Sequence, residues 1–321
     1  MNPILSINIP TYNRSRYLKE LLESIAADVL SLNGQIEINI LDNASSDDTQ
    51  SILKSRPGGV PIVYQRHERN LGALQNIHLA HRAGTGRYVW VMGDDDYLRP
   101  GQLLRIFGTL SGAPAILLLS YTRVTPDKRV IDSLSIGNQD QMLAIDKTGF
   151  DLTKIDAFIG FLSANIIERK WIDKVGAAAY DVLDARGELA HASIFYAAIA
   201  AGESVLYVSG TPLCQTMDNS HVPHDAWIHV CVKYCRYLPD ELVRLGFHEK
   251  TVRSHFGHRL MRECVRRILS EKYRGRLGSA VIRDPVVREA LGGKWRFLPV
   301  LNRVPSWVIR RVYDSIYTQR K

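Results

Sequence analysis

The chain has 321 residues, of which 45% are hydrophobic and 23% are charged, an ordinary composition for a water-soluble globular protein. Its first residues lack the basic and apolar regions of a signal peptide, and no apolar run approaches the roughly 18 residues of a membrane-spanning helix, so we expect a cytoplasmic protein. The net charge of +8 is uneven, because the segment 244–321 carries 19 Lys and Arg against 6 Asp and Glu. This segment predicts an anionic partner: a membrane surface, a nucleic acid or a phosphorylated substrate.

Strand and helix patterns alternate along the first 120 residues. Short apolar runs rich in β-branched and aromatic residues predict strands at 5–9, 36–41, 60–64, 88–92 and 115–121. Apolar stripes with helical spacing predict helices at 17–29, 72–83 and 103–110, and a short helix after Ser46. This order is typical of an α/β fold with a mostly parallel, Rossmann-like sheet, flanking helices and right-handed crossovers.

The remaining chain is less regular. An irregular excursion that could cover a site is predicted at 125–149, followed by a strand at 158–167, mainly helix at 172–201, a short strand at 205–208 and polar loop at 211–226. From residue 227 onward the pattern is helical and basic. We therefore predict one domain over residues 1–222 and a helical, basic extension over residues 223–321.

Three consecutive aspartates, Asp94, Asp95 and Asp96, follow the strand at 88–92 directly. Three carboxylates at a buried strand end would repel one another without a cation, and their hard oxygen atoms favour Mg²⁺ or Mn²⁺. The alternative is a solvated acidic turn, or an N-cap for the helix that begins near Pro100.

Polar clusters also follow two other predicted strands, at Pro10–Asn13 and at Asp42–Ser45. Ligands on parallel sheets bind outside the carboxyl ends of the strands. We therefore expect these two clusters and the three aspartates to line one crevice.

The same residues resemble a known family. Order, spacing and strand placement over roughly the first 120 residues are similar to family 2 glycosyltransferases with the GT-A fold, and weaker similarity continues to about residue 222. The Gly-Asp-Asp-Asp form resembles the abequosyltransferase-like branch, which builds bacterial surface polysaccharides such as O-antigen, capsule and exopolysaccharide. The motifs are Pro10-Thr11-Tyr12-Asn13, Asp42-Asn43-Ala44-Ser45, Asn70-Leu71-Gly72 and Gly93-Asp94-Asp95-Asp96.

The resemblance implies a nucleotide-sugar donor. Residues Pro10–Asn13 would hold its base and ribose, and Asn70 and Gly72 would lie near the pyrophosphate. Asp42 would face the base, where a carboxylate accepts the N3–H of uracil or thymine, which favours UDP or dTDP over CDP. For Ser46 and Asp47 we favour helix capping over donor contact.

The family's metal motif is Asp-x-Asp, and Gly93 stands here in place of its first aspartate. We expect Asp95 or Asp96 to bind Mg²⁺ or Mn²⁺ directly and Asp94 to contact the ribose or a metal-bound water. The ion would neutralise the leaving diphosphate.

Inverting members need a base that deprotonates the acceptor hydroxyl. The family's Glu-Asp pair is missing at the expected place, where His191 stands, so His191 is the candidate base and Glu188 the reserve. The alternative for His191 is a packing or capping role. His221, in a loop where some members contact the diphosphate, is a further candidate ligand.

Residues 306–317 predict an amphipathic helix with two arginines beside its apolar stripe. It would either pack on the catalytic domain or lie on an anionic membrane, so we place the protein in the cytoplasm with peripheral contact at the inner membrane as one alternative. The extension would serve the acceptor, membrane association or both. We expect no nucleic-acid partner, because no nucleic-acid-binding module is present.

The leading hypothesis is therefore a metal-dependent, inverting glycosyltransferase. It would move a sugar from a nucleotide donor to a glycan or lipid-linked saccharide acceptor. The competing hypothesis is a non-catalytic nucleotide-sugar-binding scaffold on the same fold, suggested by the missing acidic pair. The sequence makes no prediction of oligomeric state.

Overall fold

The computed structural model describes residues 2–145, 152–175, 191–217 and 224–273, with a few single positions beyond residue 284. The chain divides into two compact units. The first comprises Met1–Ser220 with Leu245–Phe247, and the second comprises His221–Arg244 with His248–Lys321.

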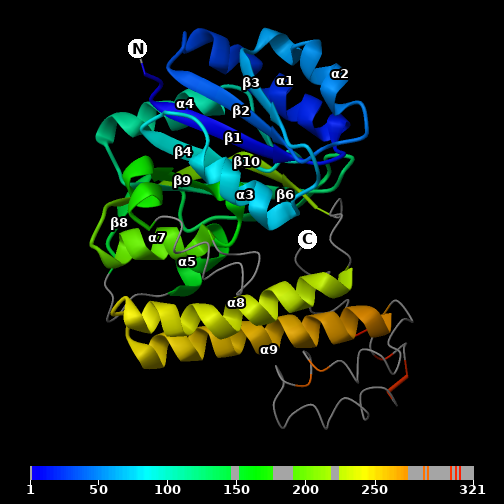
Figure 1. Ribbon diagram of the computed structural model, residues 1–321. Helices are drawn as coiled ribbons and strands as arrows, with labels where there is room; N and C mark the ends of the chain where they lie inside the picture. The colour runs from blue at the N-terminus through cyan, green and yellow to red at the C-terminus, as the bar shows by residue number, and fades with distance from the viewer. Residues whose placement is uncertain are drawn as a thin grey trace. The chain divides into compact units, whose positions relative to one another are not determined.

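The first unit is built on one mixed sheet (Figure 1). Its strands follow the order β3-β2-β1-β4-β9-β6-β10-β5, while β7 pairs with β6 and β8 with β10. The strands are β1 (Leu5–Thr11), β2 (Ile36–Asp42), β3 (Ile62–Arg66), β4 (Tyr88–Val91), β5 (Tyr97–Leu98), β6 (Ile116–Val124), β7 (Val130–Leu134), β8 (Gln141–Leu143), β9 (Asn165–Glu168) and β10 (Val205–Thr216). The first four strands in this order are mutually parallel, so their carboxyl ends meet at one edge of the sheet.

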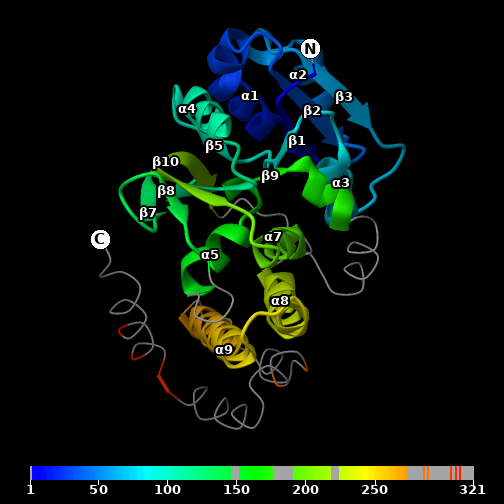
Figure 2. The ribbon, with the colours of Figure 1, turned by 90° about the vertical axis from the view of Figure 1, so that its left-hand side faces the viewer.

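Helices cover both faces of this sheet. They are α1 (Ser15–Ser31), α2 (Thr49–Lys54), α3 (Ala73–Arg82), α4 (Gln102–Thr109), α5 (Leu152–Ile159) and α7 (His191–Ala200), with 3-10 turns at Pro57–Gly59, Leu110–Gly112 and Leu162–Ala164. Figure 2 shows α1 and α4 on one side of the sheet and α3 on the other. The resulting α/β architecture with parallel strands is the one that the sequence predicts.

Alternation along β1 explains this division. Ile7 and Ile9 are fully buried in the hydrophobic core, and the residue between them, Asn8, points to the opposite face. Its amide donates to the carbonyl oxygens of Ala80 and Ala83 at 2.6 and 2.9 Å, and thereby holds the end of α3. The amide of Asn39 on β2 donates in turn to Asn8 at 2.8 Å, so this buried polar group is satisfied.

The N-terminus of α4 is capped by a residue from another helix. Asp28, near the end of α1, is only 7% exposed, and its carboxylate accepts a hydrogen bond from the Leu103 amide at 3.1 Å. A carboxylate is unfavourable at the C-terminal end of its own helix, but it is stabilised by the N-terminus of a neighbouring helix. Asp28 therefore links α1 to α4.

The segment predicted as a strand at 158–167 is helical in its first part, and this prediction was wrong there. Helix α5 continues to Ile159, and only Asn165–Glu168 form a strand, which runs antiparallel to both β4 and β6. The amide of Asn165 donates to the carbonyl oxygens of Phe158 and Phe161, at 2.8 and 2.6 Å. The two carbonyl oxygens also accept backbone hydrogen bonds from Phe161 and Ala164, so Asn165 adds a second donor to each at the end of α5.

Two loop predictions also differ from the structure. The excursion at 125–149 contains the strands β7 and β8, which lie along β6 and β10. The strand predicted at 205–208 continues to Thr216, because pairing with β6 resumes at Leu213 after an irregularity at Gly210 and Thr211, which both have positive φ. This bulge has the turn-like sequence that we interpreted as a loop.

The described part of the second unit contains two helices, α8 (His224–Arg244) and α9 (Glu249–Tyr273). They pack through an edge-to-face contact of Tyr234 and Phe256, with ring centroids 5.7 Å apart, and Arg259 lies over the Tyr234 ring. Within the described residues, no helix is long and apolar enough to cross a membrane. The amphipathic helix predicted at 306–317 lies outside them, so membrane contact stays a prediction.

Candidate active site

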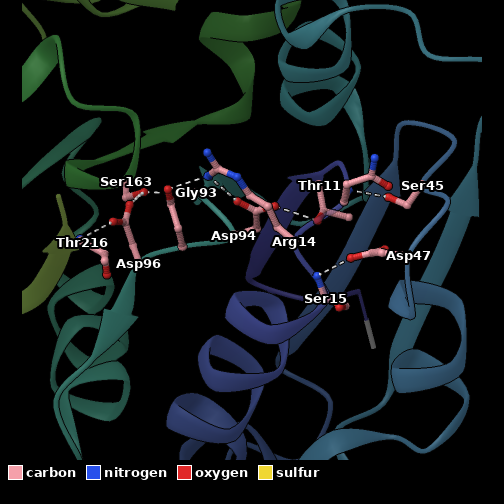
Figure 3. Close-up of polar contacts among 12 residues, drawn as sticks. Thr11, Arg14, Ser15, Ser45, Asp47, Gly93, Asp94, Asp96, Ser163 and Thr216 are labelled. Carbon is pink, nitrogen blue, oxygen red and sulfur yellow. Dashed lines mark hydrogen bonds and ion pairs between the residues drawn. The ribbon is translucent and has the colours of Figure 1, made fainter. Parts of the chain in front are cut away.

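The candidate site lies where the carboxyl ends of the parallel strands meet. The backbone amide of Asn43, just after β2, donates to the carbonyl of Thr11 at the end of β1, at 2.9 Å. The hydroxyl of Thr11 donates to Asp94, just after β4, at 2.7 Å. Residues that are 32 to 83 positions apart in the sequence thus form one connected polar network, as the shared strand ends predict (Figure 3).

An arginine neutralises part of the acidic loop Gly93–Asp96. Arg14, the residue before α1, places Nη1 3.1 Å from a carboxylate oxygen of Asp94 and 2.5 Å from one of Asp95. All three side chains are largely buried, with 15%, 6% and 18% of the Arg14, Asp94 and Asp95 side chains exposed. Sequence reasoning did not single out Arg14, although it follows the Pro10–Asn13 motif directly.

Asp96 has different partners. The Ser163 hydroxyl donates to its carboxylate at 2.6 Å, and the backbone amide of Thr216 does so at 3.3 Å. The same Ser163 oxygen accepts a hydrogen bond from the Gly93 amide at 2.8 Å. Ser163 and Thr216 come from the second half of the unit and were missed by sequence reasoning, because no motif surrounds them.

Burial and mutual repulsion shape the charges of this loop. Burial, reinforced by the charge on Asp95, raises the pKa of Asp94 to about 7 and the pKa of Asp96 well above its ordinary value. Burial opposes the charge on Arg14 as well, but Asp94 and Asp95 outweigh this effect and raise the pKa of its guanidinium. The loop therefore favours uptake of positive charge at neutral pH.

Gly93 leaves space between two of these carboxylates. A Cβ atom at this position would lie 2.9 Å from an oxygen of Asp96 and 3.0 Å from an oxygen of Asp95. Oxygen atoms that face a common space suit a small divalent cation held by one or two carboxylates and completed by water or phosphate oxygens. A full protein cage is absent, because no group of three His, Cys, Asp or Glu side chains is arranged to hold a metal in the described part of the chain.

Asp42 lies buried at the end of β2 with no exposed surface. Its carboxylate accepts hydrogen bonds from the Ser45 amide at 2.8 Å and the Tyr64 hydroxyl at 2.6 Å, and Arg66 lies 3.4 Å away. Burial and the neighbouring carboxylate raise the pKa of the Tyr64 phenol. Asp42 therefore lies beneath the surface of the site, where its carboxylate holds Tyr64 and Arg66, instead of facing a ligand directly.

The turn after β1 contacts the loop after β2. Tyr12 is 39% exposed, and Asn13 adopts a positive φ of 53°. The side chain of Asn13 accepts a hydrogen bond from the Ser46 amide at 2.7 Å. Asp47 accepts hydrogen bonds from the backbone amides of Ser15 and Thr49 at 2.9 and 3.1 Å, which places its carboxylate at the first residues of α1 and α2.

A third loop is held by a second asparagine. The Asn43 amide donates to Asn70 at 2.9 Å and its oxygen accepts from the Leu71 backbone at 2.7 Å. Asn70 accepts in addition from the Gly72 amide at 2.8 Å, and Gly72 has a φ of 88°, which glycine adopts without strain. The predicted pyrophosphate loop is thus tied to the end of β2.

His191 lies in the interior. It is 3% exposed, its Nε2 donates to the Ile159 carbonyl at 3.0 Å, and its ring stacks on His81 at a centroid distance of 6.2 Å. Burial lowers its pKa to about 4. A base must reach the acceptor hydroxyl, so this position corresponds to the packing alternative and disfavours His191 as the base. Glu188 and His221 lie outside the described residues.

The fold and the site together define the class of protein. Parallel strands that end in an acidic loop, with helices on both faces of the sheet, form an α/β domain of the GT-A type, and its candidate ligand site lies at the strand ends. The sequence model described as Glycosyl transferase family 2 matches residues 6–176, more than half of the chain. The chain belongs to this family.

Individual relatives agree with this assignment. The chain is 40% identical over 102 residues to abequosyltransferase RfbV of Salmonella typhimurium, and 33% identical over 98 residues to chondroitin synthase of Escherichia coli. These matches cover 31% and 30% of this chain, and 30% and 14% of the two relatives. The chain therefore spans less than a third of either relative.

Solved structures share the fold over most of the chain. S. aureus TarS 1-349, in complex with UDP-GlcNAc, is similar with a TM-score of 0.63 and 16% identity, over 93% of this chain and 91% of that one. The mannosyltransferase PcManGT from Pyrobaculum calidifontis, in complex with GDP-Man and Mn²⁺, has a TM-score of 0.51 and 12% identity, over 98% and 81%. At these identities the likeness concerns the fold alone.

Proposed function

We propose that this glycosyltransferase moves a sugar from a UDP- or dTDP-linked donor to a glycan or lipid-linked saccharide acceptor during surface polysaccharide synthesis. The observation that carries the proposal is the acidic loop at the ends of the parallel strands, where Arg14, Asp94 and Asp95 form a buried charged group. The identity to an abequosyltransferase supports the polysaccharide role, and the UDP-sugar complex of a protein with the same fold supports the donor class.

Different residues of the site would contact different parts of the donor. The exposed ring of Tyr12 offers a face for the base, and Tyr64 and Arg66, which the buried Asp42 holds in place, offer polar contacts at its edge. The loop of Asn70 and Gly72, held in shape by hydrogen bonds to Asn43 and within the loop, would lie near the diphosphate.

Asp95 and Asp96 are the residues that would hold Mg²⁺ or Mn²⁺, which when bound would neutralise the leaving diphosphate. Asp94 acts differently: its hydrogen bonds with Thr11 and Arg14 fix the position of the loop after β4. Inversion at the sugar requires an acceptor base. Because His191 is buried, Glu188 is the candidate that we retain.

The test is a thermal-shift screen of nucleotide-sugars with and without Mn²⁺. A ligand at 100 times its Kd should stabilise the protein by about 2.7 kcal/mol. We expect a UDP- or dTDP-sugar to give the largest shift with Mn²⁺, and Asp95→Asn to lose the metal-dependent part. The control is Asp127→Asn, which changes an exposed aspartate in the β6–β7 turn. No shift with any donor would contradict the proposal.

Turnover separates the enzyme from the alternative of a binding scaffold. We expect release of nucleoside diphosphate that depends on Mn²⁺ and on an added saccharide acceptor. The scaffold would instead be supported if the protein bound the donor but released no nucleoside diphosphate with any acceptor. In that case Glu188→Gln should leave donor binding unchanged.

A further inference from the structure

Arg14 bridges two carboxylates of the acidic loop. A single guanidinium nitrogen, Nη1, lies within hydrogen-bond distance of two different carboxylates, 3.1 Å from Asp94 and 2.5 Å from Asp95. The side chain is only 15% exposed. Charge-assisted hydrogen bonds of this kind are roughly twice as strong as neutral ones, and burial from water strengthens them further.

The two oxygens of Asp95 face different surroundings. Oδ2 accepts the hydrogen bond from Arg14, while Oδ1 faces the space above Gly93 that Asp96 also borders. A divalent cation in that space would share the Asp95 carboxylate with the guanidinium. Two positive groups on one largely buried carboxylate repel each other, so binding of either weakens binding of the other.

Asp96 contrasts with Asp95. Its hydrogen-bond partners, the Ser163 hydroxyl and the Thr216 amide, are neutral, and they orient the carboxylate without cancelling its charge. A cation would therefore approach Asp95, which already has a positive partner, and Asp96, for which the described residues provide none. The competition for the loop is thus between the cation and Arg14 at Asp95.

We propose that Arg14 is the resident counter-ion of the acidic loop, and that a divalent cation binds by displacing its guanidinium from Asp95. This inference rests on the proposed function, because it assumes that the loop takes up Mg²⁺ or Mn²⁺. Arg14 acts as a positioning residue: it holds the loop in shape before the cation arrives, and it lowers the affinity for the cation.

The test uses Mn²⁺ alone, so that donor binding does not enter. Free Mn²⁺ is titrated with protein at pH 8 and followed by electron paramagnetic resonance. Arg14→Gln should bind Mn²⁺ about tenfold more tightly than wild type, the factor that one charge-assisted hydrogen bond is worth. A purely structural role for Arg14 would give weaker binding, because the loop would lose its shape.

The control is Arg16→Gln, which removes the same charge from the first turn of α1. Arg16 is 78% exposed and pairs with Glu20 away from the loop, so we expect wild-type affinity. Equal or weaker Mn²⁺ binding by Arg14→Gln, with Arg16→Gln unchanged, would overturn the inference while the donor screen still stands. If neither the wild type nor any variant bound Mn²⁺, the inference would be overturned as well. Donor binding measured without metal would then test the proposed function separately.

A second measurement covers the case in which Arg14→Gln does not fold. The arginine Nε–H signals of wild-type protein are followed by NMR during a Mg²⁺ titration, with the Arg14 signal assigned by its loss in Arg14→Lys. We expect this signal to shift as the cation binds. A signal that stays fixed at saturating Mg²⁺ would show that the guanidinium remains on Asp95, against the proposal.

Discussion

Replacement of His191 by glutamine tests whether this histidine belongs to the interior or to the chemistry. In the structure its Nε2 donates to the Ile159 carbonyl at 3.0 Å, and no partner for its buried Nδ1 lies among the described residues. A glutamine retains a donor of similar reach and does not titrate. The substitution therefore removes the proton equilibrium while changing little else.

The magnitude follows from the pKa of the buried ring. Burial lowers the pKa of His191 from 6.5 to about 4. Between these values the unfolded chain binds a proton that the folded chain does not, so the free energy of unfolding falls as the pH falls. From pH 8 to pH 5 the wild-type protein should lose about 2 kcal/mol through His191 alone. His81, whose pKa burial also lowers, is present in both proteins and largely cancels in the comparison.

The assay is urea unfolding of both proteins at pH 8, 7, 6 and 5. At pH 8 the difference in unfolding free energy reports the packing lost in His191→Gln, which makes it an internal control. We expect this difference to shift by about 2 kcal/mol in favour of the variant by pH 5. A difference that is constant with pH would mean that His191 titrates alike in the folded and unfolded chains. His191 would then be accessible to solvent and would again be a candidate for the acceptor base.

Three further substitutions test the site. Gly93→Ala places a Cβ about 3 Å from two carboxylate oxygens, so we expect Mn²⁺ affinity to fall at least tenfold; unchanged affinity in a metal titration would show that the carboxylates move aside. Asn43→Ala removes the hydrogen bonds that hold the Asn70 loop, and calorimetry should show UDP binding weakened about fivefold, because one such bond is worth about 1 kcal/mol. Unaltered binding would separate this loop from the donor. Asp47→Ala removes the acceptor for two helix N-termini and should lower the free energy of unfolding by about 1 kcal/mol in thermal unfolding. The neighbouring Asp48 makes no capping bond through its side chain, so Asp48→Ala should cost little, and equal losses would refute the capping role.

Sequence patterns predicted the strands and the meeting of their ends. The hydrogen bond from Thr11 to Asp94 joins two clusters that the sequence places at the ends of separate strands. This was predictable because the carboxyl ends of parallel strands meet at one edge, whatever the details of the loops.

Side-chain partners from distant segments could not be predicted. Ser163 and Thr216 reach Asp96 only because β9 and β10 enter the same sheet. The apolar run 158–167 has no period that separates a buried strand from a buried helix, and the hydrogen bonds of Asn165 mark where the helix ends. The burial of His191 likewise depends on contacts with α3 and α5 that its own neighbours in the sequence do not encode.

The capping of α4 by Asp28 bears on the order of folding during synthesis. The carboxylate leaves the ribosome some 75 residues before the backbone amide that it binds. Until then it lies at the unfavourable end of α1, where it opposes the helix dipole. Helix α1 gains this partner only when the chain through the start of α4 has closed a long loop, which has an entropic cost. We therefore expect α1 and α4 to gain this stabilisation together and not helix by helix.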